Sequence, residues 1–188
     1  MGELKRKTAT YADVLAAPEH MVAEVVGGEL HLSPRPAFPH ARVAAALLGE
    51  LHGPFDRGRG GPGGWIIVAE PELHLGGEPK VLAPDLAGWR RTRMPTAPDV
   101  AYVTLAPDWV CEVLSSTSTA KYDRTVKMPA YAREGVGHAW LVDRVDRTLE
   151  VYRNLEGKWL QVATHADDEK VRVEPFESLE FDLAGLWE

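Results

Sequence analysis

The order of hydrophobic and polar residues predicts a β-hairpin near the start of the chain. Residues 21–26 and 29–32 alternate in character on either side of Gly27 and Gly28. Glycine accepts the positive φ of a tight primed turn, and paired alternating segments around such a turn are typical of a hairpin. On this alternation Glu24 shares a face with Val22 and Val26, so it points either into the protein or, like many strand glutamates, to solvent.

Three helices are predicted. Thr10 can cap a short helix over residues 11–16, and His40 opens an alanine- and leucine-rich helix over 41–51. A third helix, from about residue 119 to residue 134, would place Asp123, Lys127 and Tyr131 at successive i+4 positions on one face. The proline-rich segment 33–39 and the glycine-rich segment 53–64 are predicted to be loops.

Most of the remaining hydrophobic stretches predict strands. The strand at 109–114, the third helix and the strand at 138–143 form a strand-helix-strand unit, for which a right-handed parallel crossover is expected. The fold class is therefore α/β (α+β): a mixed β-sheet flanked by helices, with an antiparallel β extension. The predicted strands are 65–69, 72–75, a strand ending near Asp85, 109–114 and 138–143, with 148–153, 158–164 and 171–173 in the extension, and 181–187 as an apolar closing segment.

Length and composition limit the possibilities. The 188 residues suit one domain, 1–188, in which residues 1–20 form an N-terminal helix or arm. Cys111 is the one cysteine, so no internal disulfide is expected, and no stretch reaches the roughly 20 apolar residues of a membrane span. We expect a cytoplasmic protein. The net charge of -7 argues against a protein that coats nucleic acid nonspecifically, but it leaves a local basic groove possible.

The candidate chemistry starts from Glu112, a carboxylate in the middle of the apolar run 109–114. A buried charge needs a partner, because desolvation costs several kcal/mol. Asp85 also stands at the end of an apolar stretch, and two carboxylates on neighbouring strands with Lys127 close by would suit a hard divalent cation. Two structural alternatives stay open: Asp85 caps a turn after Pro84, and Glu112 pairs with an arginine such as Arg124 or Arg133.

Positive charges and histidines give further candidates. Arg90, Arg91 and Arg93 closely follow Asp85 and would hold phosphates there, or they form a solvated loop. Lys127 would either approach Glu112 or pair with Asp123 on the surface. A third hypothesis takes three histidines as ligands of a transition metal, although they lack a recognised spacing: His31, His40 and His74.

The order of these signals resembles the Uma2 family, a former domain of unknown function within the PD-(D/E)XK restriction-endonuclease-like superfamily. The resemblance covers residues 23 to 187 and rests on the following matches: Glu24 to Leu30, Ser33-Pro34 with His40, Pro84-Asp85-Leu86, Glu112 to Ser115, Asp123 with Lys127 and Tyr131, Gly135-Val136, and Trp140 to Asp143. Leu114 stands where the superfamily's E-x-K pattern has its lysine, and the resemblance implies that Lys127 replaces it.

The resemblance implies a nuclease core in which Asp85, Glu112 and the Val113 carbonyl bind Mg2+ or Mn2+. Lys127 would then orient water and stabilise charge in the transition state. Glu24 and His40 would complete the pocket, with Glu24 holding a second metal or a metal-bound water and His40 contacting the substrate. The leading hypothesis is a metal-dependent endonuclease that hydrolyses phosphodiester bonds, with DNA as partner. A homodimer is expected, for which the apolar closing segment and exposed edge strands would provide the surface. The alternative is a catalytically silent nuclease-fold module that binds DNA or protein.

Overall fold

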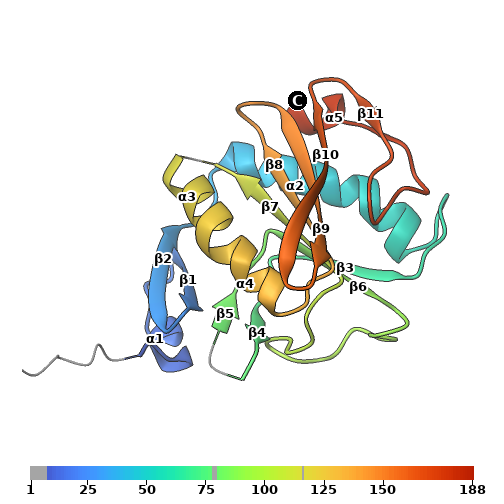
Figure 1. Ribbon diagram of the computed structural model, residues 1–188. Helices are drawn as coiled ribbons and strands as arrows, with labels where there is room; N and C mark the ends of the chain where they lie inside the picture. Colours follow the sequence, from blue (N-terminus) through green and yellow to red (C-terminus); the bar gives the residue numbers. More distant parts are fainter. Residues whose placement is uncertain (1–7, 78–79, 116) are drawn as a thin grey trace, which may run out of the picture.

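The computed structural model describes residues 8–77, 80–115 and 117–188, and in this part of the chain most strands belong to two sheets (Figure 1). One sheet has six strands, in the spatial order β10 (Lys158–Ala166), β9 (Thr148–Leu155), β8 (His138–Asp143), β7 (Trp109–Leu114), β6 (Leu86–Arg90) and β3 (Trp65–Ala69). The other has four, in the order β2 (Glu29–Pro34), β1 (Met21–Val26), β5 (Lys80–Leu82) and β4 (Leu73–Leu75).

Short helices and a small strand pair complete the described structure. The strand pair consists of β11 (Lys170–Val171) and β12 (Phe181–Asp182). The helices are α1 (Tyr11–Leu15), α2 (Phe38–Leu51), α3 (Thr117–Tyr122), α4 (Met128–Arg133) and α5 (Ala184–Trp187), with wider π-helical turns at η1 (His52–Asp56) and η2 (Asp123–Lys127). The predicted class, a mixed sheet flanked by helices with an antiparallel extension, is confirmed: β7 and β8 are parallel, while β9 and β10 continue the same sheet antiparallel.

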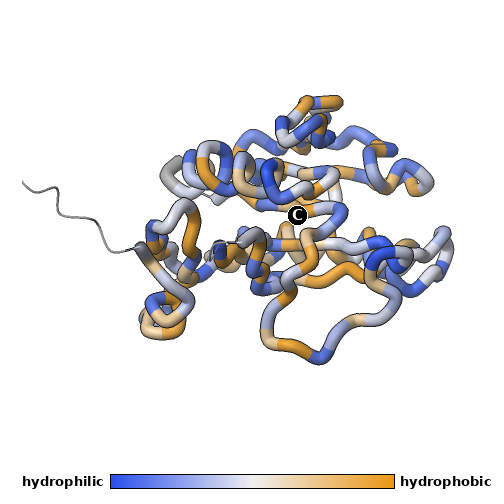
Figure 2. Tube along the Cα trace, turned by 60° about the horizontal axis from the view of Figure 1, so that its bottom comes forward, coloured by the Kyte–Doolittle hydropathy of each residue, from blue (hydrophilic) through white to orange (hydrophobic). Residues whose placement is uncertain are grey.

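The central strand β7 is buried along its whole length. Because side chains alternate across a strand, its residues divide between the two faces of the sheet. Trp109, Cys111 and Val113 pack in the core beneath α2. Val110 and Leu114 pack in the core beneath α4. Figure 1 shows these helices on opposite faces, and in Figure 2 the longest hydrophobic stretches run through the interior.

The predicted hairpin is confirmed, and its position explains how the two sheets meet. β1 and β2 pair antiparallel around Gly27 and Gly28, whose φ values of 61° and 77° are those of the left-handed region. The four-stranded sheet lies beside α3 and α4 (Figure 1), and Leu73, Leu75 and Leu82 join the core beneath α4. The connection between β5 and β6, residues 83–85, carries the chain from one sheet to the other.

The helix predicted over 119–134 is found as a continuous helical segment, but the α-helical geometry is interrupted in the middle. The π turn η2 separates α3 from α4, and the Met128 N–H bonds the Asp123 carbonyl five residues back. Pro129 explains the change: it has no N–H to donate to the Thr125 carbonyl, and in an α-helix its ring would clash with that carbonyl. A wider turn before the proline removes the clash.

Three other expectations need correction. α2 begins at Phe38, so His40 lies in its first turn and does not precede the helix. The predicted loop 53–64 starts with the π turn η1, which contains Pro54. The closing segment buries Phe181, Leu183 and Leu186 in the core, so these side chains provide no surface for a dimer. None of the described helices combines the length and the hydrophobicity that a membrane-spanning helix needs.

Candidate active site

Glu112 occupies the face of β7 that α4 covers, between Val110 and Leu114. Its side chain is 3% exposed. The Tyr131 hydroxyl donates to Glu112 Oε1 at 2.7 Å, and Lys127 Nζ lies 2.8 Å from the same oxygen. The alternative partner Arg124 instead forms a pair of hydrogen bonds with Glu150. The buried carboxylate therefore has its cation from the segment that follows its own strand.

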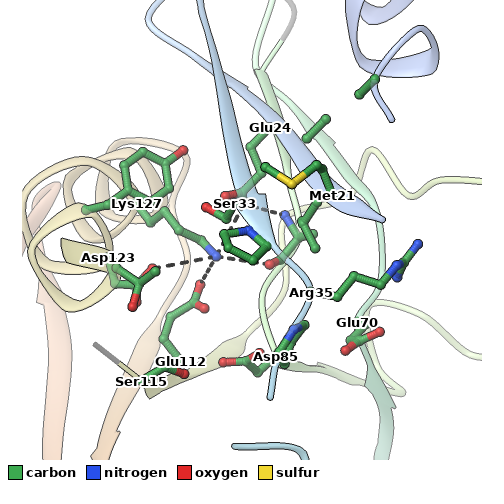
Figure 3. A pocket seen from close by; sticks show the side chains of 18 of the residues that line it. Met21, Glu24, Ser33, Arg35, Glu70, Asp85, Glu112, Ser115, Asp123 and Lys127 are labelled. Atoms are coloured by element: carbon green, nitrogen blue, oxygen red, sulfur yellow. Dashed lines mark hydrogen bonds and ion pairs between the residues drawn. The ribbon is translucent and has the colours of Figure 1, made fainter. Parts of the chain in front are cut away.

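Lys127 stands at the centre of the acidic groups (Figure 3). Its ammonium donates to the Ala83 carbonyl at 3.0 Å and lies 2.8 Å from Glu112 and 3.2 Å from Glu24. Three acceptors thus match the three protons of the ammonium. Asp123 is a more distant neighbour at 3.9 Å. The structure therefore places Lys127 beside Glu112, and its pairing with Asp123 is inside the protein, not on the surface.

Glu24 points inward from β1, since its side chain is 5% exposed. Glu24 Oε1 contacts Lys127 and also accepts the Ala83 N–H at 2.8 Å. Ala83 therefore offers its N–H to Glu24 and its carbonyl to Lys127. This arrangement fixes the connection between β5 and β6 next to Asp85.

Asp85 directly precedes β6 and faces the end of β7. Its Oδ2 accepts the Val113 N–H at 2.6 Å, and its Oδ1 lies 2.7 Å from His40 Nε2. A carboxylate only accepts, so Nε2 donates, and in the neutral ring Nδ1 accepts the Ser115 hydroxyl. In a strand the N–H and C=O of one residue point to the same side, so the Val113 carbonyl faces the Asp85 side too.

The pKa values follow from burial and crowding of like charges. Burial raises the pKa of Glu112 well above its usual range; Lys127 opposes the rise, and Asp123, Asp85 and Glu24 add to it. Burial likewise raises the pKa of Asp123 from 3.8 to about 6. Burial alone would lower the pKa of Lys127, but Glu112, Glu24, Tyr131 and Asp123 raise it well above its usual value. The lysine therefore remains protonated, while burial favours the protonated forms of Glu112 and Asp123.

The donors suit a hard cation. Mg2+ prefers oxygen ligands and is usually held by one or two carboxylates together with water. Asp85 and Glu112 supply two carboxylates from adjoining segments, and both line a cavity of about 660 Å3. In the described residues no three His, Cys, Asp or Glu side chains group closely enough to hold a metal by themselves.

The arginines expected at this site lie elsewhere. β6 starts after Asp85 and ends at Arg90, so the three arginines lie at or just beyond the opposite end of that strand. Arg90 lies over the Trp65 ring, Arg91 pairs with Asp56, and Arg93 pairs with Asp108. At about 3.3 Å per residue, a strand of this length separates its ends by roughly 16 Å. None of the three lines the cavity around Asp85.

The three histidines do not converge on one metal site in the described structure. His40 belongs to the Asp85 cluster. His74 bonds Glu72 and stacks on Tyr102, whereas His31 packs against the Tyr122 ring. The hypothesis of a site formed by all three is therefore not supported by their placement.

Sequence reasoning left several neighbours of the site unassigned. Asp123 and Tyr131 share the i+4 spacing of Lys127, so this spacing was the signal for them. Ser115, Tyr122 and Arg35 also line the cavity. Ser115 lay within the family match but had no assigned role, and no local pattern marks Tyr122 or Arg35. The Tyr122 hydroxyl is buried without a hydrogen-bond partner in the described part of the protein.

Two features define the restriction-endonuclease-like class of folds. One is the mixed sheet with helices on both faces, and the other is the group of acidic residues with one lysine at the end of β7. A solved structure supports this class: a protein from Anabaena variabilis ATCC 29413, described as "a putative nuclease belonging to DUF820", is 21% identical and matches with a TM-score of 0.73. The match covers 95% of this chain and 97% of that one.

The family follows from a second comparison. The model of the Uma2 family, described as "Putative restriction endonuclease", matches residues 9–184. The chain belongs to the Uma2 family, as the resemblance in its sequence predicted, and a nuclease-like function goes with that family. No curated protein matches the chain significantly.

Proposed function

We propose that this protein is a metal-dependent endonuclease that hydrolyses phosphodiester bonds in DNA. The observation that carries the proposal is the grouping of Asp85, Glu112 and Lys127 at one end of β7, beside a cavity large enough for a substrate. Family membership supports the nuclease class, and the contacts of these three residues support the chemistry.

Asp85 and Glu112 would hold Mg2+ or Mn2+, with the Val113 carbonyl as a third ligand. When bound, such an ion lowers the pKa of water and offsets negative charge on the phosphate. The cluster has four carboxylates, from Glu24, Asp85, Glu112 and Asp123, around the single ammonium of Lys127. Burial makes the charged forms of Glu112 and Asp123 unfavourable, and a divalent cation that displaces their protons would stabilise those charged forms.

Lys127 would position the attacking water and stabilise charge that develops on the phosphate. A protonated lysine can do both, and it is a poor general base because its pKa is raised. The carboxylates of Glu24 and Glu112 and the Ala83 carbonyl hold its ammonium in place before substrate arrives. Such preorganisation avoids a reorganisation cost during the reaction.

His40 and Tyr131 act on the two carboxylates. His40 donates to Asp85 and is itself held by Ser115, while Tyr131 donates to Glu112. Both contacts restrict carboxylate rotation, which keeps the oxygen ligands oriented. We therefore assign His40 to positioning Asp85, in place of a direct contact with substrate.

The test is cleavage of DNA in Mg2+ by the wild-type protein and by Asp85→Asn and Glu112→Gln variants, with folding checked by circular dichroism. Each substitution preserves shape and removes a negative charge. We expect cleavage to fall by at least about 100-fold, in line with the loss of one essential electrostatic contact. Unchanged cleavage by either folded variant would refute the assignment.

The assembly is a separate proposal. We infer a homodimer through an edge strand, since β2 and β10 are outer strands of their sheets and expose Leu30, Leu32 and Leu160. Unpaired strand edges with apolar side chains favour association. Sedimentation velocity tests this proposal, and a monomer at all accessible concentrations would contradict it.

A further inference from the structure

The shape of the cavity at Asp85 bears on which form of DNA can reach it. The reacting groups lie deep, because the side chains of Asp85 and His40 are 14% and 11% exposed and Glu112 and Lys127 are still more buried. The cavity is bounded by α1, by the β1–β2 hairpin, by the start of α2 and by the α3–η2 segment. A phosphate must therefore enter a recess between several elements to approach these groups.

One wall of the recess is apolar. It consists of side chains from α1 and the segment after it, from β1, and from the proline-rich segment before α2, among them Val14, Leu15, Met21, Val22 and Pro36. Phosphate and sugar groups make no use of such a surface, whereas the faces of an unstacked base do. Leu15 is 69% exposed on this wall, which makes it available to a ligand.

The charged residues that line the recess also bear on which form of DNA can enter it. In the described residues that line the cavity, carboxylates come from Glu19, Glu24, Glu70, Glu72, Asp85, Glu112 and Asp123, against the cations Arg35 and Lys127. Lys127 is already surrounded by carboxylates, and Arg35 donates to the Glu19 carbonyl. Figure 3 shows Arg35 across the cavity from Asp123 and Lys127.

Duplex DNA fits these features poorly. It carries a phosphate charge about every 1.7 Å of axis, twice the density of a single strand, and needs a row of basic residues to neutralise it. It is also stiff, with a persistence length of about 150 base pairs, and keeps its bases stacked inside. The arginines that could have formed a basic row lie at the far end of β6.

A polar group in the recess also lacks a partner. Tyr122 lines the cavity, and its hydroxyl is buried with no hydrogen-bond partner in the described structure. Buried polar groups nearly always have a partner, so an unpaired one beside a cavity indicates that a ligand or water supplies it. The edge of a base or a phosphate oxygen would accept the hydroxyl proton.

From these observations we propose that the substrate is a single-stranded or unpaired segment of DNA, whose base packs on the wall of α1 and β1 while its phosphate lies at Asp85. This inference rests on the proposed nuclease function and adds the form of the substrate. Tyr122 and Leu15 are the residues that contact the nucleotide. The strand enters without the opposing strand, so cleavage is expected at unpaired sites.

The experiment compares one fluorescein-labelled strand of mixed sequence with the same strand annealed to its complement. Cleavage is measured in Mg2+, and binding is measured by fluorescence anisotropy in Ca2+. We expect the single strand to bind and to be cut at least about tenfold better than the duplex. Equal or better binding and cleavage of the duplex would overturn this inference and leave the nuclease function standing.

Two variants test the contacts. Leu15→Asp adds a charge to the exposed wall and should weaken single-strand binding about tenfold. Leu155→Asp is the control, since it alters an exposed leucine on β9 outside the cavity, and it should not weaken this binding. Tyr122→Phe should weaken binding about fivefold, the effect of one lost hydrogen bond, without lowering the melting temperature.

The outcomes separate the two proposals. Tight single-strand binding that depends on Leu15 and Tyr122, without cleavage in Mg2+, would refute the nuclease function and retain the ligand. Binding unaffected by Leu15→Asp and Tyr122→Phe would overturn the proposed base contact, even if cleavage depends on Asp85.

Discussion

Replacing Asp123 with asparagine tests the electrostatics of the site most sharply. Asp123 is buried on the π turn η2, with Lys127 at 3.9 Å and other carboxylates nearby. Burial raises its pKa from 3.8 to about 6 despite the opposing field of Lys127. The ionised form is therefore unfavourable in the folded protein, and asparagine removes that charge while nearly preserving the shape.

The size of the effect follows from the pKa. A rise from 3.8 to about 6, at about 1.4 kcal/mol for each pKa unit, corresponds to about 3 kcal/mol. The folded state holds this proton more tightly than the unfolded chain does. The contribution of this proton to the free energy of unfolding is therefore fully present below pH 3.8. It decreases as the pH rises through the folded-state pKa of about 6 and is absent at higher pH. Asp123→Asn removes this loss.

The assay is urea unfolding in EDTA at pH 4 and at pH 8. We expect Asp123→Asn to raise the free energy of unfolding by up to about 3 kcal/mol at pH 8 and by little at pH 4. Asp99→Asn, at an exposed position, serves as the control and should change stability by less than about 0.5 kcal/mol at both pH values. A variant destabilised at pH 8 would refute the reasoning, because it would make Asp123 a net stabilising partner of Lys127.

Three further outcomes are expected. Pro129→Ala allows the π turn to become α-helical, which displaces Lys127, and should reduce the initial rate of cleavage by about 100-fold. Pro54→Ala, in the other π turn, is the control and should not reduce this rate. Arg91→Ala should leave the cleavage rate within about twofold, because Arg91 lies outside the cavity. It should lower the free energy of unfolding by less than about 1 kcal/mol, because Arg91 pairs with Asp56 at a half-exposed position. We propose one domain, since both sheets share the core beneath α4, so fluorescence and circular dichroism should follow one coincident unfolding transition; two separated transitions would contradict it.

Local patterns predicted much of the fold. Gly27 and Gly28 between alternating segments specified the hairpin, because both the turn and the pairing are local. The parallel pairing of β7 with β8 followed from the helical segment between them. The partner of Glu112 could also be anticipated, since a buried carboxylate needs a cation and Lys127 lies in the segment that crosses back over its strand.

Other features depended on effects that spacing does not report. The i+4 rule assumes a regular α-helix, whereas Pro129 forces the wider turn that carries Asp123 and Lys127. Proximity in sequence suggested that Arg90 would serve Asp85, but the extended strand β6 carries it to the opposite end of the sheet. The linkage of Ser115 through His40 to Asp85 joins three separate segments, and only the tertiary structure brings them together.

The most direct test of the central claim is calorimetric titration of Mn2+ into the wild-type protein and into Asp85→Ala and Glu112→Gln, near pH 7 and in two buffers of different ionisation enthalpy. We expect the wild type to bind Mn2+ and release protons, because the carboxyl pKa values raised by burial fall when a cation arrives. Both variants should lose this binding. Mn2+ binding of equal affinity in the wild type and in either variant would contradict a metal site at Asp85 and Glu112.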